Sequence, residues 1–183
     1  MIDRLFFDTD CLSSFLWTDR GCLLAQMYPN RIVIPEMVYD ELQRVHQPKF
    51  AKRLNTLLAA GNVLRMDIDV GTTTYSLFRK MTARPDPGKP MIGKGEASAI
   101  ALAKEHSGIV ASNNFRDIRH YIHDLNLDYR STGDILEEAY NDGLVTMNEA
   151  EQIWATMLAE DCWIGANSFR EYLGKPHKPL MNE

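Results

Sequence analysis

The sequence has 183 residues, which suits one domain with a substantial core or a domain with a small helical appendage. Hydrophobic residues make up 45% and charged residues 25%, which excludes a disordered chain because enough apolar surface can be buried to offset chain entropy. The net charge of −5 argues against a protein that binds nucleic acid through a basic surface alone. A nuclease remains compatible with this charge, since divalent cations in an acidic pocket supply positive charge locally.

No apolar run approaches the roughly 20 residues that a transmembrane helix needs. The start of the chain has Asp3 where a signal peptide would carry positive charge, so we expect a cytoplasmic protein without membrane contact. Cys11, Cys22 and Cys162 are odd in number and include no CxxC pair, which favours neither a disulfide framework nor a zinc site. We expect all three to be small buried side chains.

The beginning of the chain predicts a strand, a tight turn and a helix. The apolar run over residues 5–7 predicts a strand that ends at Asp8. Thr9 or Asp10 is then a suitable N-cap for a helix over residues 11–17.

Later segments continue the alternation of strands and helices. The β-branched run over residues 31–34 predicts a strand, and Pro35 favours the first position of the next helix. Residues 84–95 combine three prolines with three glycines, which predicts a surface loop leading to a site. The other elements expected are helices over 22–28, 72–81, 96–105 and 115–123, strands over 62–66, 109–111 and 127–130, and helices from Thr132 onward, broken at Gly143 and near Gly165.

This order of elements predicts an α/β fold, a three-layer α/β/α sandwich around a parallel β-sheet with extra C-terminal helices. We assign residues 1–145 to this domain and residues 146–183 to a helical extension packed on it. Ligands of such sheets bind beyond the carboxyl ends of the strands, where Asp8 and residues 112–114 fall. The topology therefore predicts that distant acids meet at one edge.

Asp8 directly follows an apolar strand at that edge. It is either a functional carboxylate or only an Asx turn that caps the following helix. We favour a functional role, because Thr9 or Asp10 is able to cap the helix instead. Asp10 has the same two interpretations.

Glu41 is separated from neighbouring acids by helix geometry. Val38, Leu42 and Val45 form the inward stripe of its helix, and Glu41 lies at the edge of that stripe. A carboxylate there needs a partner, because burying an unpaired charge costs several kcal/mol. A metal ion is one candidate, and a salt bridge to an arginine is the alternative.

Glu96 starts a helix in the same way. Ala99, Ile100 and Ala103 follow it at three, four and seven residues, so Glu96 heads an apolar stripe. An N-terminal glutamate favoured by the helix dipole is the ordinary alternative.

A fourth acid is expected after the strand over residues 109–111, yet Ser112, Asn113 and Asn114 stand there and Asp117 is the nearest carboxylate. Asn114 and Asp117 also have the spacing of a helix cap and its third residue, which needs no catalysis. Either asparagine offers an amide oxygen as a ligand or as an anchor for water.

Carboxylates with few nitrogen or sulfur partners are typical ligands of Mg²⁺ or Mn²⁺. Water activated by such an ion and a neighbouring acid can attack a phosphodiester, while the ion offsets phosphate charge. Lys94 and Arg116 are candidates for binding the phosphate at the rim. His120 and His123 lie three residues apart without further ligands nearby, which favours a surface role.

Residues 6–12, 34–42 and 95–103 resemble successive motifs of PIN-domain proteins in order and spacing. Residues 131–145 and 163–173 are similar to the end of a PIN subgroup. The resemblance covers most of the chain. It implies an endoribonuclease that acts on RNA with Mg²⁺ or Mn²⁺. Many relatives are toxins of toxin–antitoxin pairs and form homodimers, so the resemblance also implies an antitoxin partner and a homodimer.

The resemblance carries Asp8, Glu41 and Glu96 over as metal-site residues and Ser112 as a supporting hydroxyl, to which we add Thr9. Two positions depart from the family pattern. Asp10 stands where the family often has asparagine, which adds an acid. Asn114 stands where the family usually has aspartate, which removes an acid. We therefore expect Asn114 to be a neutral metal ligand and Asp117 to assist catalysis.

Two other functions stay open. A haloacid-dehalogenase-like phosphatase also begins with a strand and an Asp-x-Asp motif, with Asp8 as nucleophile and Asp10 as acid–base. Cys11 and Leu12 do not fit the residues expected after that motif. The second alternative is a PIN fold that has lost catalysis and binds RNA or a protein partner, and Asn114 is the residue that favours it.

Overall fold

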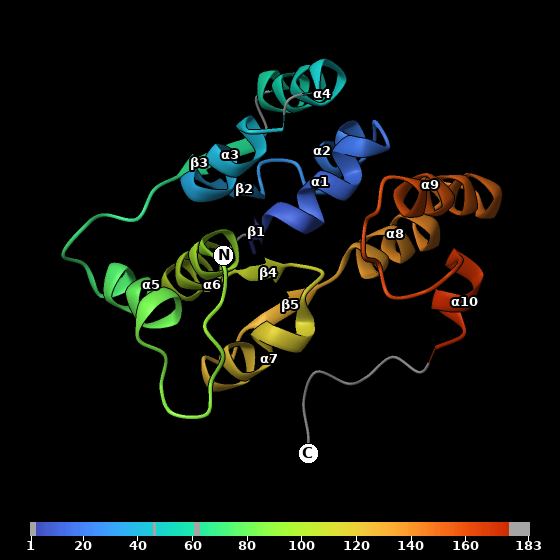
Figure 1. Ribbon diagram of the computed structural model, residues 1–183. Helices are drawn as coiled ribbons and strands as arrows, with labels where there is room; N and C mark the ends of the chain where they lie inside the picture. The colour runs from blue at the N-terminus through green and yellow to red at the C-terminus, as the bar shows by residue number, and fades with distance from the viewer. Residues whose placement is uncertain (1–2, 46, 61–62, 176–183) are drawn as a thin grey trace.

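A parallel five-stranded sheet runs through the centre of the molecule (Figure 1). The computed structural model describes residues 3–45, 47–60 and 63–175. The strands lie in the order β3-β2-β1-β4-β5. Their bounds are β1 Leu5–Phe7, β2 Ile32–Pro35, β3 Val63–Met66, β4 Ile109–Ala111 and β5 Asp128–Arg130. The predicted strands are confirmed, and Asn62, the predicted start of β3, lies outside the described residues.

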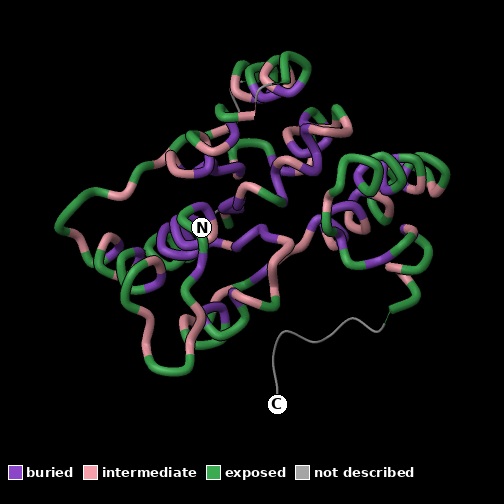
Figure 2. Tube along the Cα trace, in the orientation of Figure 1, coloured by how far each residue is buried: buried purple, intermediate pink, exposed green. Residues whose placement is uncertain are grey.

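The central strand β1 pairs with β2 on one side and β4 on the other. Leu5 pairs with Ile32 of β2 on one side and with Ile109 of β4 on the other. Alternate side chains enter opposite layers, so that Leu5 and Phe7 join one core cluster and Phe6 joins the second. Figure 2 shows buried chain at the centre of the molecule and on the helices around it, and the residues of β1 and β2 are all buried. Strands covered on both faces explain the continuous apolar runs in the sequence.

Helices cover both faces of the sheet, which confirms the three-layer α/β/α sandwich. One layer, around Leu5 and Phe7, contains α1 Thr9–Trp17, α2 Gly21–Met27, α3 Glu36–Gln43, α4 Pro48–Ala59, α8 Thr132–Asn141, α9 Met147–Ala159 and α10 Phe169–Leu173. The other layer, around Phe6, contains α5 Thr73–Ala83, α6 Lys94–His106 and α7 Phe115–Asp124. Among the described residues, no helix has the length and apolar character needed to cross a membrane.

Several helix starts differ from the sequence expectation by one or two residues, and α6 begins at Lys94, so that Glu96 is its third residue and not its first. Asp8 itself is the N-cap of α1, with its side chain accepting the Cys11 amide, whereas Thr9 and Asp10 already lie inside the first turn. The expectation that Thr9 or Asp10 caps this helix is therefore wrong. Pro35 is the last residue of β2 and the N-cap of α3, one position before the predicted place.

Helix α4 is an addition to the predicted elements. Pro48 occupies its first turn, and Phe50, Leu54 and Leu57 are buried against the core. In α3, Val38 and Leu42 are buried as expected, but the helix ends at Gln43. Val45 is thus outside the helix and only partly buried.

The cysteine prediction holds for Cys11 alone. Cys11 is buried, Cys162 is half-buried and Cys22 is exposed, with all three thiols free. Cys22 is exposed because α2 buries Gly21, Leu23 and Leu24 and turns the intervening side chain outward.

The C-terminal helices pack onto the core through Trp154. Its indole is fully buried, and Nε1 donates to the Ala166 carbonyl at 3.0 Å. The Phe169 and Tyr172 rings lie 5.8 Å and 5.2 Å from it. Helix α9 also contacts α1 and α8. The division of the chain at residue 145 stays a prediction.

Trp154→Ala should lower the free energy of unfolding by about 3–5 kcal/mol, because it opens a large cavity and leaves the Ala166 carbonyl without its donor. Urea denaturation measures this change. Trp163→Ala is the matched control, since Trp163 is 74% exposed and its loss should cost less than about 0.5 kcal/mol. Similar small losses for both variants would contradict the integration of the C-terminal helices into the core.

Candidate functional site

Polar side chains meet where β1 and β4 end. Asp8 follows β1, and Ser112 and Asn114 follow β4. The first turns of α1 and α6 and the edge of α3 add Thr9, Asp10, Glu96 and Glu41. The parallel sheet thereby brings together residues that lie more than 100 positions apart in the chain.

Asp8 is the most deeply buried acid of this group, with 1% of its surface exposed. Its Oδ1 accepts the Cys11 amide at 2.7 Å, whereas its Oδ2 is buried without a hydrogen-bond partner. Burial raises the pKa of Asp8 to about 7, although the nearby Ser112 hydroxyl and the hydrogen bond from the Cys11 amide lower it. The negative charges of Asp10 and Glu96 raise this pKa further.

Glu41 is half-buried at the edge of α3, as its spacing predicts. The Thr9 hydroxyl donates to its Oε2. Among the residues described, no arginine forms an ion pair with Glu41, and the nearby Arg65 pairs with Glu36 instead. Its partner is therefore a threonine hydroxyl from α1, which neither of the two sequence interpretations included.

Gly95 allows this contact. A Cβ atom at Gly95 would lie 2.8 Å from both Glu41 Oε2 and Thr9 Oγ1, and 3.4 Å from Val38 Cγ2. A side chain there would displace the Glu41 carboxylate and the Thr9 hydroxyl from their contact, or push α6 away from α1 and α3. Gly95 was not among the predicted site residues, although its place directly before Glu96 is visible in the sequence.

Glu96 accepts two hydrogen bonds. Its Oε2 accepts the Gly93 amide at 2.9 Å, which completes the start of α6, a capping contact that the sequence interpretations of Glu96 did not include. Its Oε1 accepts Asn114 Nδ2 at 2.7 Å. The same amide nitrogen lies 3.0 Å from Asp117 Oδ2. Asn114 therefore joins a carboxylate of α6 to one of α7.

Asn114 is the N-cap residue of α7, but its side chain makes no capping hydrogen bond. The capping-box interpretation of Asn114 and Asp117 is thus wrong, because the amide turns to the two carboxylates. Asn113 has another role: its Oδ1 accepts the Thr132 amide at 2.9 Å, and its Nδ2 lies 3.4 Å from Ser14 Oγ. Of the two asparagines, only Asn114 faces the acids.

Ser112 is buried beside Asp8, and its hydroxyl accepts a hydrogen bond from the backbone N–H of Asn114 at 3.2 Å. The Tyr129 hydroxyl donates to its carbonyl at 2.5 Å, a support that the sequence did not indicate. Asp10, Lys94 and Arg116 are exposed around the group.

Part of this arrangement fits a divalent cation. Asp8 Oδ2 lacks a partner, and the carboxylates of Asp10 and Glu96 are near enough to affect its pKa. Mg²⁺ commonly takes one or two carboxylates and keeps several waters. However, within residues 3–45, 47–60 and 63–175, no three acidic, histidine or cysteine side chains converge closely enough to hold a metal ion. His120 and His123 are exposed on α7.

The raised pKa of Asp8 predicts a pH-dependent stability. Unfolded Asp8 ionises near 3.8 and folded Asp8 near about 7, so the wild type loses stability as pH rises through this window. Asp8→Asn keeps the cap acceptor without the charge. Its free energy of unfolding relative to wild type should rise by about 4 kcal/mol between pH 4 and 7.5.

Denaturant unfolding at a series of pH values measures this difference. Asp40→Asn, an exposed acid on α3, controls for the loss of one negative charge. A pH profile for Asp8→Asn that parallels the Asp40→Asn profile would disprove the raised pKa.

Comparison with known proteins gives one family match. A family model described as a PIN domain matches residues 4–177. Among solved structures, the crystal structure of FitAcB from Neisseria gonorrhoeae is 18% identical, with coverage of 70% of this chain and 97% of that chain and a TM-score of 0.46. No curated protein matches the sequence.

Proposed function

Because the chain belongs to the PIN-domain family, we propose that it is a ribonuclease that hydrolyses RNA phosphodiester bonds with Mg²⁺ or Mn²⁺. The observation that carries the proposal is the Asp8 carboxylate, buried with Oδ2 unpartnered beside Asp10 and Glu96. A buried carboxylate without a donor is costly, and a cation is the partner that offsets both burial and the neighbouring charges.

In this proposal Asp8 and Glu96 hold the ion, with Asp10 and the amide oxygen of Asn114 as further ligands. A bound divalent ion would lower the pKa of water and offset charge on the phosphate. We assign to Glu41 and Asp117 the role of accepting the proton of the attacking water.

The remaining site residues orient these groups. Thr9 fixes one oxygen of Glu41 through its hydroxyl, and Ser112 lies buried beside Asp8. Lys94 and Arg116, both exposed at the rim, are proposed to bind phosphate.

A catalytically weakened binding module is the second candidate. Glu96 supports it, because both of its oxygens already accept hydrogen bonds from Gly93 and Asn114. An ion that binds Glu96 Oε1 must compete with the Asn114 amide. The phosphatase alternative is set aside by the family assignment.

Other properties rest on family membership alone. We propose RNA as the substrate on the ground of family membership, because carboxylate and metal chemistry attacks the backbone of RNA and DNA alike. A role as the toxin of a toxin–antitoxin pair, an antitoxin partner, a homodimer and a cytoplasmic location are proposals of the same kind.

Cleavage of single-stranded RNA with Mn²⁺ tests the activity. Asp8→Asn and Glu96→Gln should each reduce cleavage by at least about 100-fold, because each removes a charged ligand. Glu105→Gln, an exposed change on the same helix as Glu96, should cleave like the wild type. Equal cleavage by all four proteins would indicate a contaminating nuclease and refute the proposal.

Asn114→Asp tests how the amide contributes to metal binding. Without metal, a third carboxylate beside Glu96 and Asp117 should lower the melting temperature by about 2–4 °C through like-charge repulsion. With millimolar Mn²⁺, the variant should gain more stability than the wild type, since a ligand stabilises the state that binds it. Thermal unfolding with and without Mn²⁺ measures both effects.

Asn113→Asp is the matched control, because it adds the same charge to a side chain that contacts Thr132 and Ser14 instead. A Mn²⁺ response of Asn114→Asp no larger than that of this control would refute metal binding at the acids.

A further inference from the structure

Helix α7 leads away from the acidic group with a basic outer face. Arg116, Arg119, His120 and His123 are all exposed on it. At 100° per residue, these four side chains lie within about 100° of one another around the helix axis. The opposite side buries Ile118, Tyr121 and Ile122.

The basic side chains on this face have few competing anions. Within the described part of the chain, neither Arg116 nor Arg119 nor His120 takes part in an ion pair. Asp124, which lies near His123, is engaged by Lys89 at 2.5 Å. The outer face of α7 is therefore free to bind an external anion, although the whole chain carries a net charge of −5.

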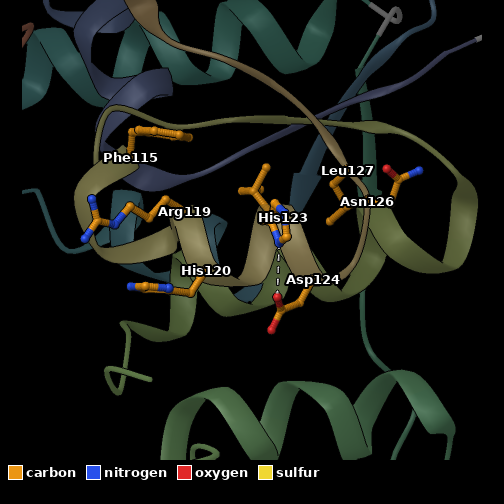
Figure 3. Close-up of a pocket in the computed structure, with 8 residues that line it drawn as sticks. Phe115, Arg119, His120, His123, Asp124, Asn126 and Leu127 are labelled. Atoms are coloured by element: carbon orange, nitrogen blue, oxygen red, sulfur yellow. Dashed lines mark hydrogen bonds and ion pairs between the residues drawn. The ribbon is translucent and has the colours of Figure 1, made fainter. Parts of the chain in front are cut away.

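A pocket of about 250 Å³ opens beside the same residues (Figure 3). Phe115, Ile122 and Leu127 supply its apolar lining. The polar groups of the lining are Arg119, His120, His123, Asn126 and the Lys89-paired Asp124. The Phe115 ring is held against Tyr129, with ring centroids 4.9 Å apart. An aromatic ring fixed next to an arginine is an arrangement on which nucleic-acid bases stack.

We propose that this face of α7 binds single-stranded RNA, with phosphates along Arg116 and Arg119 and one base in the pocket beside Phe115. The inference rests on the proposed ribonuclease function and names the surface that positions its substrate. A single strand fits better than a duplex because the base must be unstacked to reach Phe115. An acidic peptide would match the charge but not the aromatic pocket.

The surface is continuous with the acidic group. Asn114 starts α7 and contacts Glu96 and Asp117, and Phe115 and Arg116 are the next two residues. RNA bound along the outer face would thus reach the carboxylates at the N-terminal end of the helix, where the helix dipole also favours phosphate.

Fluorescence anisotropy with a labelled uridine oligonucleotide, without divalent metal, measures binding separately from cleavage. The double variant Arg116→Ala/Arg119→Ala should bind about tenfold more weakly. The slope of log K against log salt concentration should become about 1.4 less steep, because two phosphate contacts are lost. Lys49→Ala/Lys52→Ala is the matched control, since it removes two exposed cations from α4, on the far side of the molecule from α7 (Figure 1).

Phe115→Leu separates stacking from charge. Leucine keeps an apolar contact with Tyr129 but removes the ring, so affinity should fall at least about fivefold with the salt dependence unchanged. Thermal unfolding of each variant identifies losses caused by misfolding.

Weaker binding by both α7 variants and unchanged binding by the α4 control would support the inference, even if no RNA is cleaved and the proposed function fails. Unchanged binding by the folded α7 variants would overturn it while leaving the ribonuclease proposal intact. Absence of RNA binding by the wild type, or equal displacement of RNA by polyglutamate, would also overturn it.

Discussion

The carboxylate of Asp8 is the group around which the rest of the site is organised. It ends the central strand, caps α1 through Oδ1 and leaves Oδ2 buried without a donor. The structural interpretation of this residue is thus confirmed for Oδ1, whereas the functional interpretation concerns Oδ2 and stays a prediction. A cap needs only one acceptor, so the second oxygen is unexplained by helix stability and adds a burial cost that raises the pKa to about 7.

The approach of α6 to α1 and α3 imposes a second constraint. Gly95 brings its backbone against Glu41 and Thr9, where a Cβ atom would lie 2.8 Å from each. Glu96 follows directly, so its position beside Asp8 depends on the missing side chain one residue earlier. The small residues that continue this helix, Ala97 and Ala99, are fully buried and allow the same close packing along its length.

The sequence predicted the sheet, the alternation of layers and the edge position of Glu41, because periodicity reports which face of an element is buried. It did not predict which donor each carboxylate would find. The Thr9–Glu41 contact and the two-sided contact of Asn114 depend on side-chain rotation and on helices that are distant in sequence. The prediction that Cys22 is buried was wrong for a related reason. Apolar neighbours in the sequence say little about which way one side chain of a short helix points.

Asn114 connects the chemistry of the acids with the helix that follows. Its single amide nitrogen donates toward Glu96 at 2.7 Å and Asp117 at 3.0 Å, and so reduces the repulsion between two carboxylates in the way a weak cation would. A metal ion bound at Glu96 Oε1 would displace this donor and free the amide. Since Asn114 is also the N-cap residue of α7, an ion bound in this way would be linked to the basic face of α7 through one side chain. The neutral residue is therefore better described as a link between the acids and α7 than as a lost ligand.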